Sequence, residues 1–489
     1  MRRRSVFAIV SVLAVTLVGS ATSSASTSTA PRAARVTSPL NLGNDLFAQN
    51  EESLGMTPDG AVLAGAWNDW NYNDGCGFSY STNGGSSWAR QTFVPGFTRF
   101  TNDQNVPGTG RFDAAGDPSV VYNPKSGLFD VICQAFGTKS GNQIQLLATT
   151  FDAARANPNA DVNASYGAAA WTTPVAITTG LTNGSQKGSN GNFPDHETIA
   201  VDTSPGSPHF GRLYVTWAQF SGSGISPILF AYSDDDGHTW TGPIKVSDKT
   251  SNSNQDSRPA VAPDGTVYVT WLGAPNENST KDNLVLISKS TNGGSTWSPA
   301  AVAAAVVKPI DPQTALLPNS NYRVFEDAWS AVDPASGKVV VAFTDRKTGP
   351  SNIYAVHNVT AGDISSWSSP VAVRPSPNQQ FFPWVSAAPN GRVDVAFYDR
   401  TCDPVDTKDC VTLGSTFDDG ATWGITKLTT TGFDGDQYQA CIAFIESPNC
   451  GFFFLGDYIA VASTNSKAQV LWTGNGPSSM DVFSQSASF

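Results

Sequence analysis

The sequence has few charged side chains and very few of the residues that bind metals or nucleic acids. Only 14% of its 489 residues are charged, and there are 4 histidines and 3 methionines. The 29 basic side chains are outnumbered by 41 acidic ones, which disfavours both a nucleic-acid partner and an anionic membrane surface. The chain also lacks a nucleotide-binding loop, a zinc motif and a Ser-His-Asp arrangement. These absences argue against the corresponding classes of enzyme.

Turn-forming and aromatic residues are abundant instead. The chain contains 44 Gly, 31 Pro and 13 Trp, and 40% of its residues are hydrophobic, which is enough to bury a large core. Because turn-formers and aromatics favour short strands over helices, this composition predicts an all-β fold.

The first 35 residues resemble a targeting segment. Arg2, Arg3 and Arg4 precede an apolar run at 6–18, which is shorter than the roughly 20 residues of a membrane-spanning helix. Small residues follow, as a signal peptidase requires. We predict a signal peptide at 1–25 and a Ser/Thr/Ala-rich linker at 26–35. No later apolar segment could anchor the chain, so we expect a secreted, extracellular protein.

Six cysteines follow the predicted signal peptide, which fits an oxidising exterior. Six cysteines allow 15 pairings. The short spacings favour Cys402–Cys410 and Cys441–Cys450 as local loop bridges, which leaves Cys76 and Cys133. None of the spacings is that of a metal site.

An apolar hairpin recurs along the chain. Each copy has two apolar segments joined by a turn, usually containing Gly, as buried antiparallel strands do. Seven copies occupy residues 56–67, 118–136, 199–217, 260–271, 331–343, 385–397 and 459–472.

A second repeat follows four of these hairpins. Residues 81–88, 233–240, 290–297 and 416–423 share the pattern Ser/Thr-x-Asp/Asn-x-Gly-x-Ser/Thr-Trp. In such a turn the Asp or Asn bonds the local backbone, glycine takes positive φ and tryptophan covers the turn. We therefore assign structural roles to Asn83, Asp235, Asn292 and Asp418.

Together the two repeats predict units of four strands, the pattern of a β-propeller blade. Seven blades follow from the hairpin count, and six remain the alternative if one hairpin is peripheral. The last unit lacks a fourth strand, which the segment 36–46 could supply. We predict one domain at 36–489, with the Ser/Thr-Trp turns on one face.

The four turns resemble the Asp-box (BNR) repeats of sialidases and related propellers, especially secreted bacterial sialidase-like proteins. The resemblance implies an exo-glycosidase that cleaves terminal sialic or other acidic sugars from glycans. Such boxes also occur in lectin-like and sortilin-like propellers, so a non-catalytic carbohydrate-binding or cell-surface interaction propeller is the alternative. We expect a monomer with no cofactor, and a bound Ca²⁺ stays open.

The opposite face carries an acidic ring. The first residue of each inner strand contributes one side chain, and five of the seven are carboxylates. Converging like charges repel unless a cation, a sugar or arginines lie between them, or water solvates them in a funnel. The ring positions are Glu51, Asp117, His196, Asp256, Asp327, Phe382 and Asp457.

The resemblance also implies roles for particular residues on this face. Tyr458 matches the family's nucleophile, Glu326 its base and Asp74 its general acid. A tyrosine suits an anionic substrate, which would repel a carboxylate nucleophile. The substrate carboxylate would be held by Arg258, Arg346 and Arg400. The chain departs from the family where an Arg-Ile-Pro element is expected, because Glu51 and Glu52 stand there, so a glycosidase using other acids is equally open.

Overall fold

The protein is described by a computed structural model covering residues 33–43, 47–69, 75–99, 110–137, 142–160, 165–182, 191–222, 225–248, 253–273, 283–310, 315–438, 440–441 and 453–489. The predicted signal peptide, most of the predicted linker, Asp74 and Cys450 lie outside these ranges. Within the described ranges, no helix combines the length and apolar character needed to cross a membrane.

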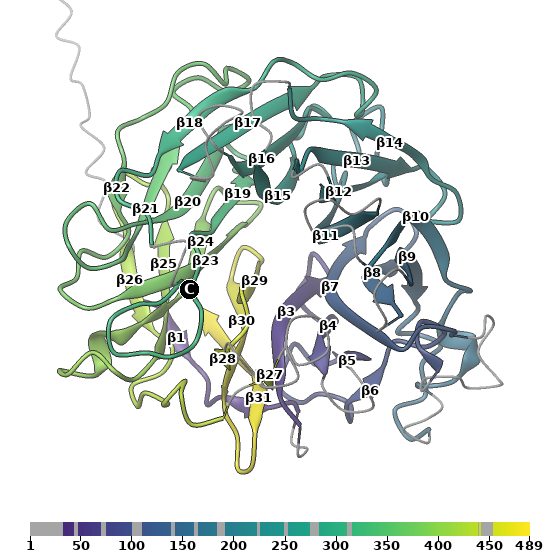
Figure 1. Ribbon diagram of the computed structural model, residues 1–489, viewed down its shortest axis with the longest axis horizontal. Coiled ribbons are helices and arrows are strands. Elements are labelled where there is room, and N and C mark those ends of the chain that lie inside the picture. Colours follow the sequence, from purple (N-terminus) through teal and green to yellow (C-terminus); the bar gives the residue numbers. More distant parts are fainter. Residues whose placement is uncertain are drawn as a thin grey trace, which may run out of the picture.

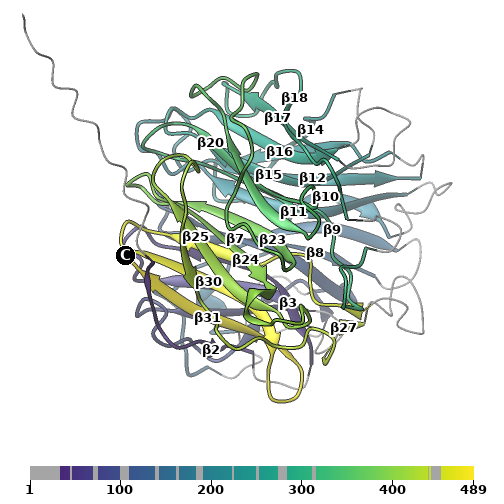
Figure 2. The ribbon, with the colours of Figure 1, turned by 90° about the vertical axis from the view of Figure 1, so that its left-hand side faces the viewer.

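Seven antiparallel sheets stand around a central axis, so the predicted all-β propeller with seven blades is confirmed (Figure 1). The inner strands β3, β7, β11, β15, β19, β23 and β29 lie nearest the middle, and the side view shows the blades stacked around the ring (Figure 2). Only two short 3₁₀ turns, Ala168–Ala170 and Arg400–Cys402, interrupt the β structure of the described residues.

Six blades each use four consecutive strands. The first three blades are β3 (Gln49–Met56), β4 (Leu63–Asp69), β5 (Gly75–Ser81) and β6 (Thr92–Phe93); β7 (Ala114–Asn123), β8 (Leu128–Phe136), β9 (Gln143–Phe151) and β10 (Val175–Leu181); and β11 (Asn192–Val201), β12 (Leu213–Ser221), β13 (Ile228–Ser233) and β14 (Thr241–Lys245). The next three are β15 (Asn254–Val261), β16 (Val267–Gly273), β17 (Leu284–Ser290) and β18 (Ala301–Ala305); β19 (Ala328–Val332), β20 (Val339–Asp345), β21 (Asn352–His357) and β22 (Val371–Ala372); and β23 (Gln380–Ala387), β24 (Val393–Asp399), β25 (Cys410–Thr416) and β26 (Gly424–Lys427). A separate two-stranded sheet pairs β27 (Ala440–Cys441) with β28 (Phe453–Phe454).

The seventh blade joins the two ends of the chain. It contains β29 (Ala460–Ser463), β30 (Lys467–Asn475) and β31 (Met480–Ser488), and β31 also pairs with β1 (Arg35–Val36) and β2 (Leu40–Asn41). The prediction that an N-terminal segment completes this blade is therefore confirmed. Lys467 reinforces the closure, because its Nζ donates to the carbonyls of Gly60 and Gly84 in the first blade at 2.9 and 3.0 Å. Closing the ring removes the exposed sheet edges that an open β fold would leave.

The Ser/Thr-Trp turns form as their residue types require. In one of them, Asp418 Oδ1 accepts the backbone N–H of Thr422 at 2.9 Å and the hydroxyl of Thr416 at 2.7 Å. The Trp423 ring donates to the carbonyl of Gly420 at 3.0 Å, so the ring covers the turn. The same side-chain to backbone bond is present at Asn83, Asp235 and Asn292. These side chains tie the turns together.

Two disulfides link described cysteines. Cys402–Cys410 closes a short loop, and Cys76–Cys133 ties β5 of the first blade to β8 of the second. Both pairings agree with the sequence-based expectation. The third expected pair includes Cys450, which lies outside the described residues, so it stays a prediction.

Candidate functional site

Five inner strands contain the same local irregularity near the channel mouth. In β3, β7, β11, β15 and β23 the strand register shifts, and one non-glycine residue adopts a left-handed conformation with φ between 50° and 61°. A left-handed backbone conformation is energetically unfavourable for any residue other than glycine. A β-bulge of this kind changes the direction in which a side chain points. They are Glu51, Asp117, His196, Asp256 and Phe382, five of the seven ring positions predicted from the sequence. The remaining two, Asp327 and Asp457, precede β19 and β29.

An arginine that the sequence analysis missed enters this ring from a loop. Arg323 lies between β18 and β19, and its Nε and Nη2 atoms contact the two carboxylate oxygens of Asp457 at 3.2 and 2.5 Å. Its guanidinium carbon also lies 4.5 Å from the ring centroid of Phe454. Since Arg323 belongs to no repeat and starts no strand, periodicity gives no signal for it.

Arg258 is held by the walls of the channel. Its Nη1 donates to Thr198 Oγ1 at 3.0 Å, and its Nη2 lies 3.5 Å from Asp327 Oδ1 and 4.0 Å from Asp256 Oδ1. The guanidinium carbon stands 4.0 Å from the ring centroid of Trp329. Arg258 is therefore both charge-paired and stacked on an aromatic face.

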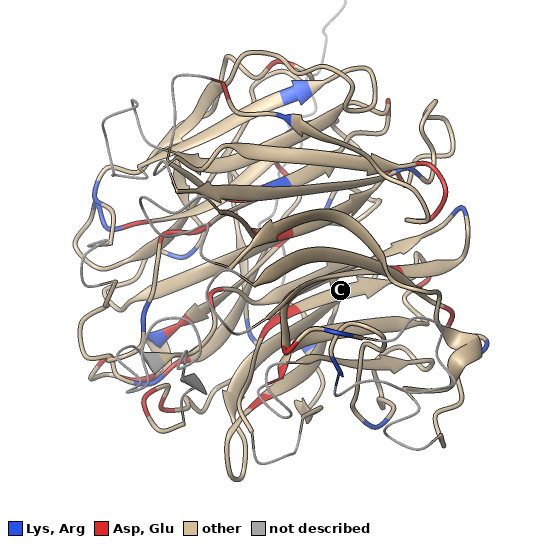
Figure 3. Ribbon diagram, turned by 45° about the vertical axis from the view of Figure 1, so that its right-hand side comes forward, with Lys and Arg blue, Asp and Glu red and all other residues tan. Residues whose placement is uncertain are grey.

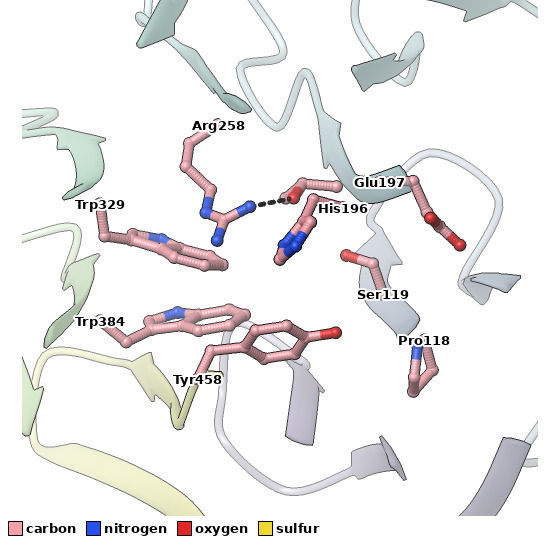
Figure 4. A pocket seen from close by; sticks show the side chains of 9 residues that line it. Pro118, Ser119, His196, Glu197, Arg258, Trp329, Trp384 and Tyr458 are labelled. Atoms are coloured by element: carbon pink, nitrogen blue, oxygen red, sulfur yellow. Dashed lines mark hydrogen bonds between the residues drawn. The ribbon is translucent and has the colours of Figure 1, made fainter. Parts of the chain in front are cut away.

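Two tryptophans and a tyrosine continue this stack (Figure 4). The centroids of Trp329 and Trp384 are 3.3 Å apart, and that of Trp384 is 6.2 Å from Tyr458. The Tyr458 hydroxyl points toward the side of the pocket where Pro118 and Ser119 lie (Figure 4). The stack thus connects the blade of Arg258 to the start of the seventh blade.

A small cavity lies among these side chains. Its volume is about 10 Å³, roughly the space of one water molecule. It is lined by Pro118, Ser119, His196, Glu197, Thr198, Arg258, Trp329, Trp384 and Tyr458. A sugar ring does not fit in this space, so a glycan must bind outside it or the aromatic side chains must move.

The carboxyl groups around the cavity differ in protonation. Burial raises the pKa of Glu51 well above its ordinary value, and repulsion by Asp117 and Asp457 adds to the effect. Burial, followed by repulsion from Asp117, likewise raises the pKa of Glu197. Burial raises the pKa of Asp327 to about 7 against the opposing charge of Arg258. These three acids therefore retain protons at higher pH than free carboxyl groups do.

His196 and Asp256 form the charged pair of the site. Burial alone would lower the pKa of His196, but Asp195 and Asp256 raise it well above its ordinary value. Burial would raise the pKa of Asp256, but the charge and hydrogen bond of His196 lower it. The His196 Nδ1 atom lies 3.1 Å from Asp256 Oδ1. The His196–Asp256 pair thus sits beside acids whose pKa values are raised.

The acids with the largest effect on the pKa of Tyr458 are Asp117, Glu51 and Glu197, and the predicted role of Glu326 stays a prediction. Burial raises the pKa of Tyr458 well above its usual range, and Asp117, Glu51 and Glu197 raise it further. Glu326 instead accepts a hydrogen bond from the backbone N–H of Ile310. The structure therefore brings Tyr458 together with acids of the first three blades.

Of the three predicted clamp arginines, only Arg258 lines the cavity. Arg400 is fully buried and donates to Asp409 Oδ1 at 2.8 Å, to the Tyr322 hydroxyl at 2.6 Å and to backbone carbonyls. Arg346 is half-buried and its backbone N–H donates to the carbonyl of Lys308 at 3.0 Å. These contacts do not bring the three arginines together in the cavity wall.

No metal centre is evident among the described residues. In the part of the chain that the structure covers, no three His, Cys, Asp or Glu side chains are grouped so that they could hold a metal ion. The acids of the ring are instead separated by cationic and aromatic side chains.

Comparisons with known proteins place the chain by fold. No family model matches it, and no curated protein matches it. A protein of unknown function from Dyadobacter fermentans is 12% identical over 94% of this chain and 99% of its own, with a TM-score of 0.51. The Hadza microbial sialidase Hz136 is 16% identical over 92% and 68% of the two chains, with a TM-score of 0.44. A polysaccharide lyase of family PL25, an ulvan lyase, is 10% identical over 92% and 94%, with a TM-score of 0.47. At these identities the likeness concerns the fold alone, so the activity must be argued from the site.

Proposed function

We propose that the protein is a secreted glycoside hydrolase that removes terminal sugars from glycans at the mouth of the propeller channel. The observation that carries this proposal is the position of Tyr458. Its phenol lines a cavity together with Glu197, Arg258 and two tryptophans. The charges of Asp117 and Glu51 raise its pKa. A nucleophile beside several acids with raised pKa values is a recognised arrangement for acid–base chemistry.

In this mechanism the Tyr458 oxygen attacks the anomeric carbon, and the bond from that carbon to the leaving oxygen breaks. We propose that the phenol proton passes to Glu197 or Asp117 in place of Glu326. Since burial raises the pKa of both acids, this step requires the form in which the accepting acid has lost its own proton. The leaving oxygen takes a proton from a general acid, a role for which Asp74 remains a prediction. Water then hydrolyses the glycosyl-tyrosine: its hydroxyl bonds to the anomeric carbon, its proton restores the general acid, and the acid that took the phenol proton returns it to the Tyr458 oxygen.

The charge pairing disfavours sialic acid as the sugar. Arg258 is already paired with Asp327, and Arg323 with Asp457. A substrate carboxylate would have to displace these buried carboxylates and would meet the repulsion of the ring. The site therefore supports a sugar without negative charge better than an acidic one.

The test is release of fluorophore from 4-methylumbelliferyl glycosides by the purified mature chain. The panel contains neutral, amino, uronic and sialic glycosides, and Tyr458→Phe is compared with Tyr214→Phe. Tyr214 is a fully buried tyrosine of β12 whose hydroxyl has no hydrogen-bond partner among the described residues, so its variant removes one oxygen far from the cavity. We expect turnover of an uncharged or amino glycoside that falls at least about 100-fold in Tyr458→Phe only. Equal turnover in both variants would exclude Tyr458 as the nucleophile.

The second candidate function is carbohydrate binding without catalysis. Two observations favour it, namely the small cavity and the raised pKa of Tyr458, which keeps the phenol protonated. This function predicts no turnover across the whole panel together with measurable sugar affinity. It also predicts that Tyr458→Phe binds sugar as well as the wild type does.

A further inference from the structure

We propose that the channel mouth binds the ammonium group of an amino sugar, such as a 2-amino-2-deoxyhexose, between the acids of the ring. The sugar part of this inference rests on the proposed function, whereas the preference for a cation rests on the charges and contacts of the site. Neither the resemblance to sialidases nor the likeness of fold predicts a cationic ligand.

The first observation is the excess of carboxyl groups over cations. Seven carboxyl groups, which lie in or just before six of the inner strands, converge near the axis, and they face three basic groups. The acidic stretches are red in Figure 3, and basic ones are blue. The groups that act on one another here are Glu51, Asp117, Asp195, Glu197, Asp256, Asp327 and Asp457, with His196, Arg258 and Arg323.

The second observation is an unsatisfied acid in the cavity wall. Glu197 is only 4% exposed and lines the cavity, yet neither of its carboxyl oxygens accepts a hydrogen bond from another described residue. Buried polar atoms without partners are rare and call for an explanation such as an absent ligand. An ammonium group supplies three donors and a charge of the required sign.

The basic groups of the site do not meet this demand. Arg258 and Arg323 are committed to Asp327 and Asp457, and His196 contacts Asp256. A compact metal ion is also disfavoured, because the described acids, histidines and cysteines form no group that could hold one. An ammonium group fits separated acids better, because its three N–H donors point in different directions.

The mouth offers both access and an apolar wall. The side chains of Asp195, His196 and Arg323 are 26%, 15% and 20% exposed, so the ring reaches solvent there. Trp384 and Tyr458 form part of the cavity wall. A sugar could place its charged amine among the acids and its ring carbons toward these aromatic side chains.

Without a bound cation, protons on the carboxyl groups offset part of the repulsion between these acids. Burial and mutual repulsion raise the pKa values of Glu51, Asp117 and Glu197, so these acids hold protons that a nearby ammonium would expel. Binding of the cationic sugar should therefore release protons to the buffer.

The test is calorimetric titration with methyl glucosaminide and with methyl N-acetylglucosaminide at mildly acid pH. Both are single sugars, so the general attraction of an acidic protein for polycations does not arise. We expect the amine to bind at least about tenfold more tightly, with heats that depend on the ionisation enthalpy of the buffer. Glu197→Gln should lose about this tenfold preference.

Asp130→Asn is the matched control. Asp130 is a buried carboxyl group of β8 whose oxygens also lack hydrogen-bond partners among the described residues, and it is not part of the cavity lining. This variant should bind the amine as the wild type does. Equal affinity for the two sugars, or tighter binding of Ca²⁺ than of the amine, would overturn the inference. Amine binding without turnover of any glycoside would uphold the inference and reject the hydrolase, whereas turnover of neutral glycosides without amine preference would do the reverse.

Discussion

The guanidinium group of Arg258 lies over the ring of Trp329, with its central carbon 4.0 Å from the ring centroid. The same indole stacks on Trp384, and Trp384 in turn contacts the tilted ring of Tyr458, so one arginine supports a row of three aromatic side chains. Because the charge of Arg258 also opposes the rise in the pKa of Asp327, 3.5 Å away, it contributes to the site through packing and through charge.

Replacing Arg258 by Met should therefore destabilise the fold. Two carboxyl groups, Asp256 and Asp327, would lose their shared partner, and removing one member of a buried pair typically costs about 3–5 kcal/mol. Chemical denaturation measures the change in the free energy of unfolding. Adding Asp327→Asn to Arg258→Met should recover part of the loss. A loss of stability that the second substitution leaves unchanged would mean that the charge pairing contributes little.

Arg400→Met should also lower stability, by about 3–5 kcal/mol, because it leaves Asp409 buried without its cation. Sugar binding at the channel mouth should stay unchanged, since Arg400 does not line the cavity. Denaturation and sugar titration of the same variant separate the two roles. A loss of sugar affinity with wild-type stability would support the clamp that the resemblance to sialidases implies.

Glu52 should make stability depend on pH. Burial raises its pKa from 4.5 to about 8, against a hydrogen bond from Thr473. Between these values the folded chain keeps a proton that the unfolded chain releases, so stability is full below 4.5 and falls as pH rises through about 8. At neutral pH the pKa difference between the folded and the unfolded chain changes the free energy of unfolding by about 3 kcal/mol. Glu52→Gln, which does not titrate, should flatten the decline measured by denaturation across this window.

Asp363→Asn provides the control for that measurement. Asp363 is half-buried, and hydrogen bonds from Ser365 lower its pKa, so it is ionised in both states throughout the window. The slope of stability against pH should therefore remain that of the wild type. An unchanged slope in Glu52→Gln would show that other acids of the channel govern the decline.

The two disulfides should differ in their effect on stability. Cys76–Cys133 spans 57 residues and Cys402–Cys410 spans 8, and a longer loop restricts the unfolded chain more. Replacing each pair by Ala should cost about 4 kcal/mol for the long bridge and about 2.5 kcal/mol for the short one. Thermal and chemical denaturation of the two double variants under the same conditions compare them. The opposite order would point to structure retained in the unfolded state.

Much of the architecture could be predicted because it repeats. Each blade carries its own turn residues, so Asp235 and Asp418 mark their hairpins without reference to the remainder of the chain. The ring positions followed from strand direction, since the first residue of an inner strand must face the mouth. Glu51 and Asp117 do lie at inner-strand bulges, but β3 begins at Gln49 and β7 at Ala114, so these side chains belong to the strand interior and not to its first position.

The candidate site could be predicted only in part, because its contacts join distant segments. Arg323 meets Asp457 across 134 positions, and Arg258 meets Thr198 across 60. Arg400 follows a strand in the way Arg346 does, yet it turns into a buried network with Asp409. Local pattern cannot distinguish a guanidinium that turns inward from one that faces a ligand.

The sequence by itself determined the blades, their turns and the acids near the start of the inner strands, because each depends on neighbours a few residues away. The tertiary structure decided which of those acids keep their protons, which arginines are already paired and how little space remains beside Tyr458. Those properties depend on burial and on distances between blades, and both are fixed only when the ring closes.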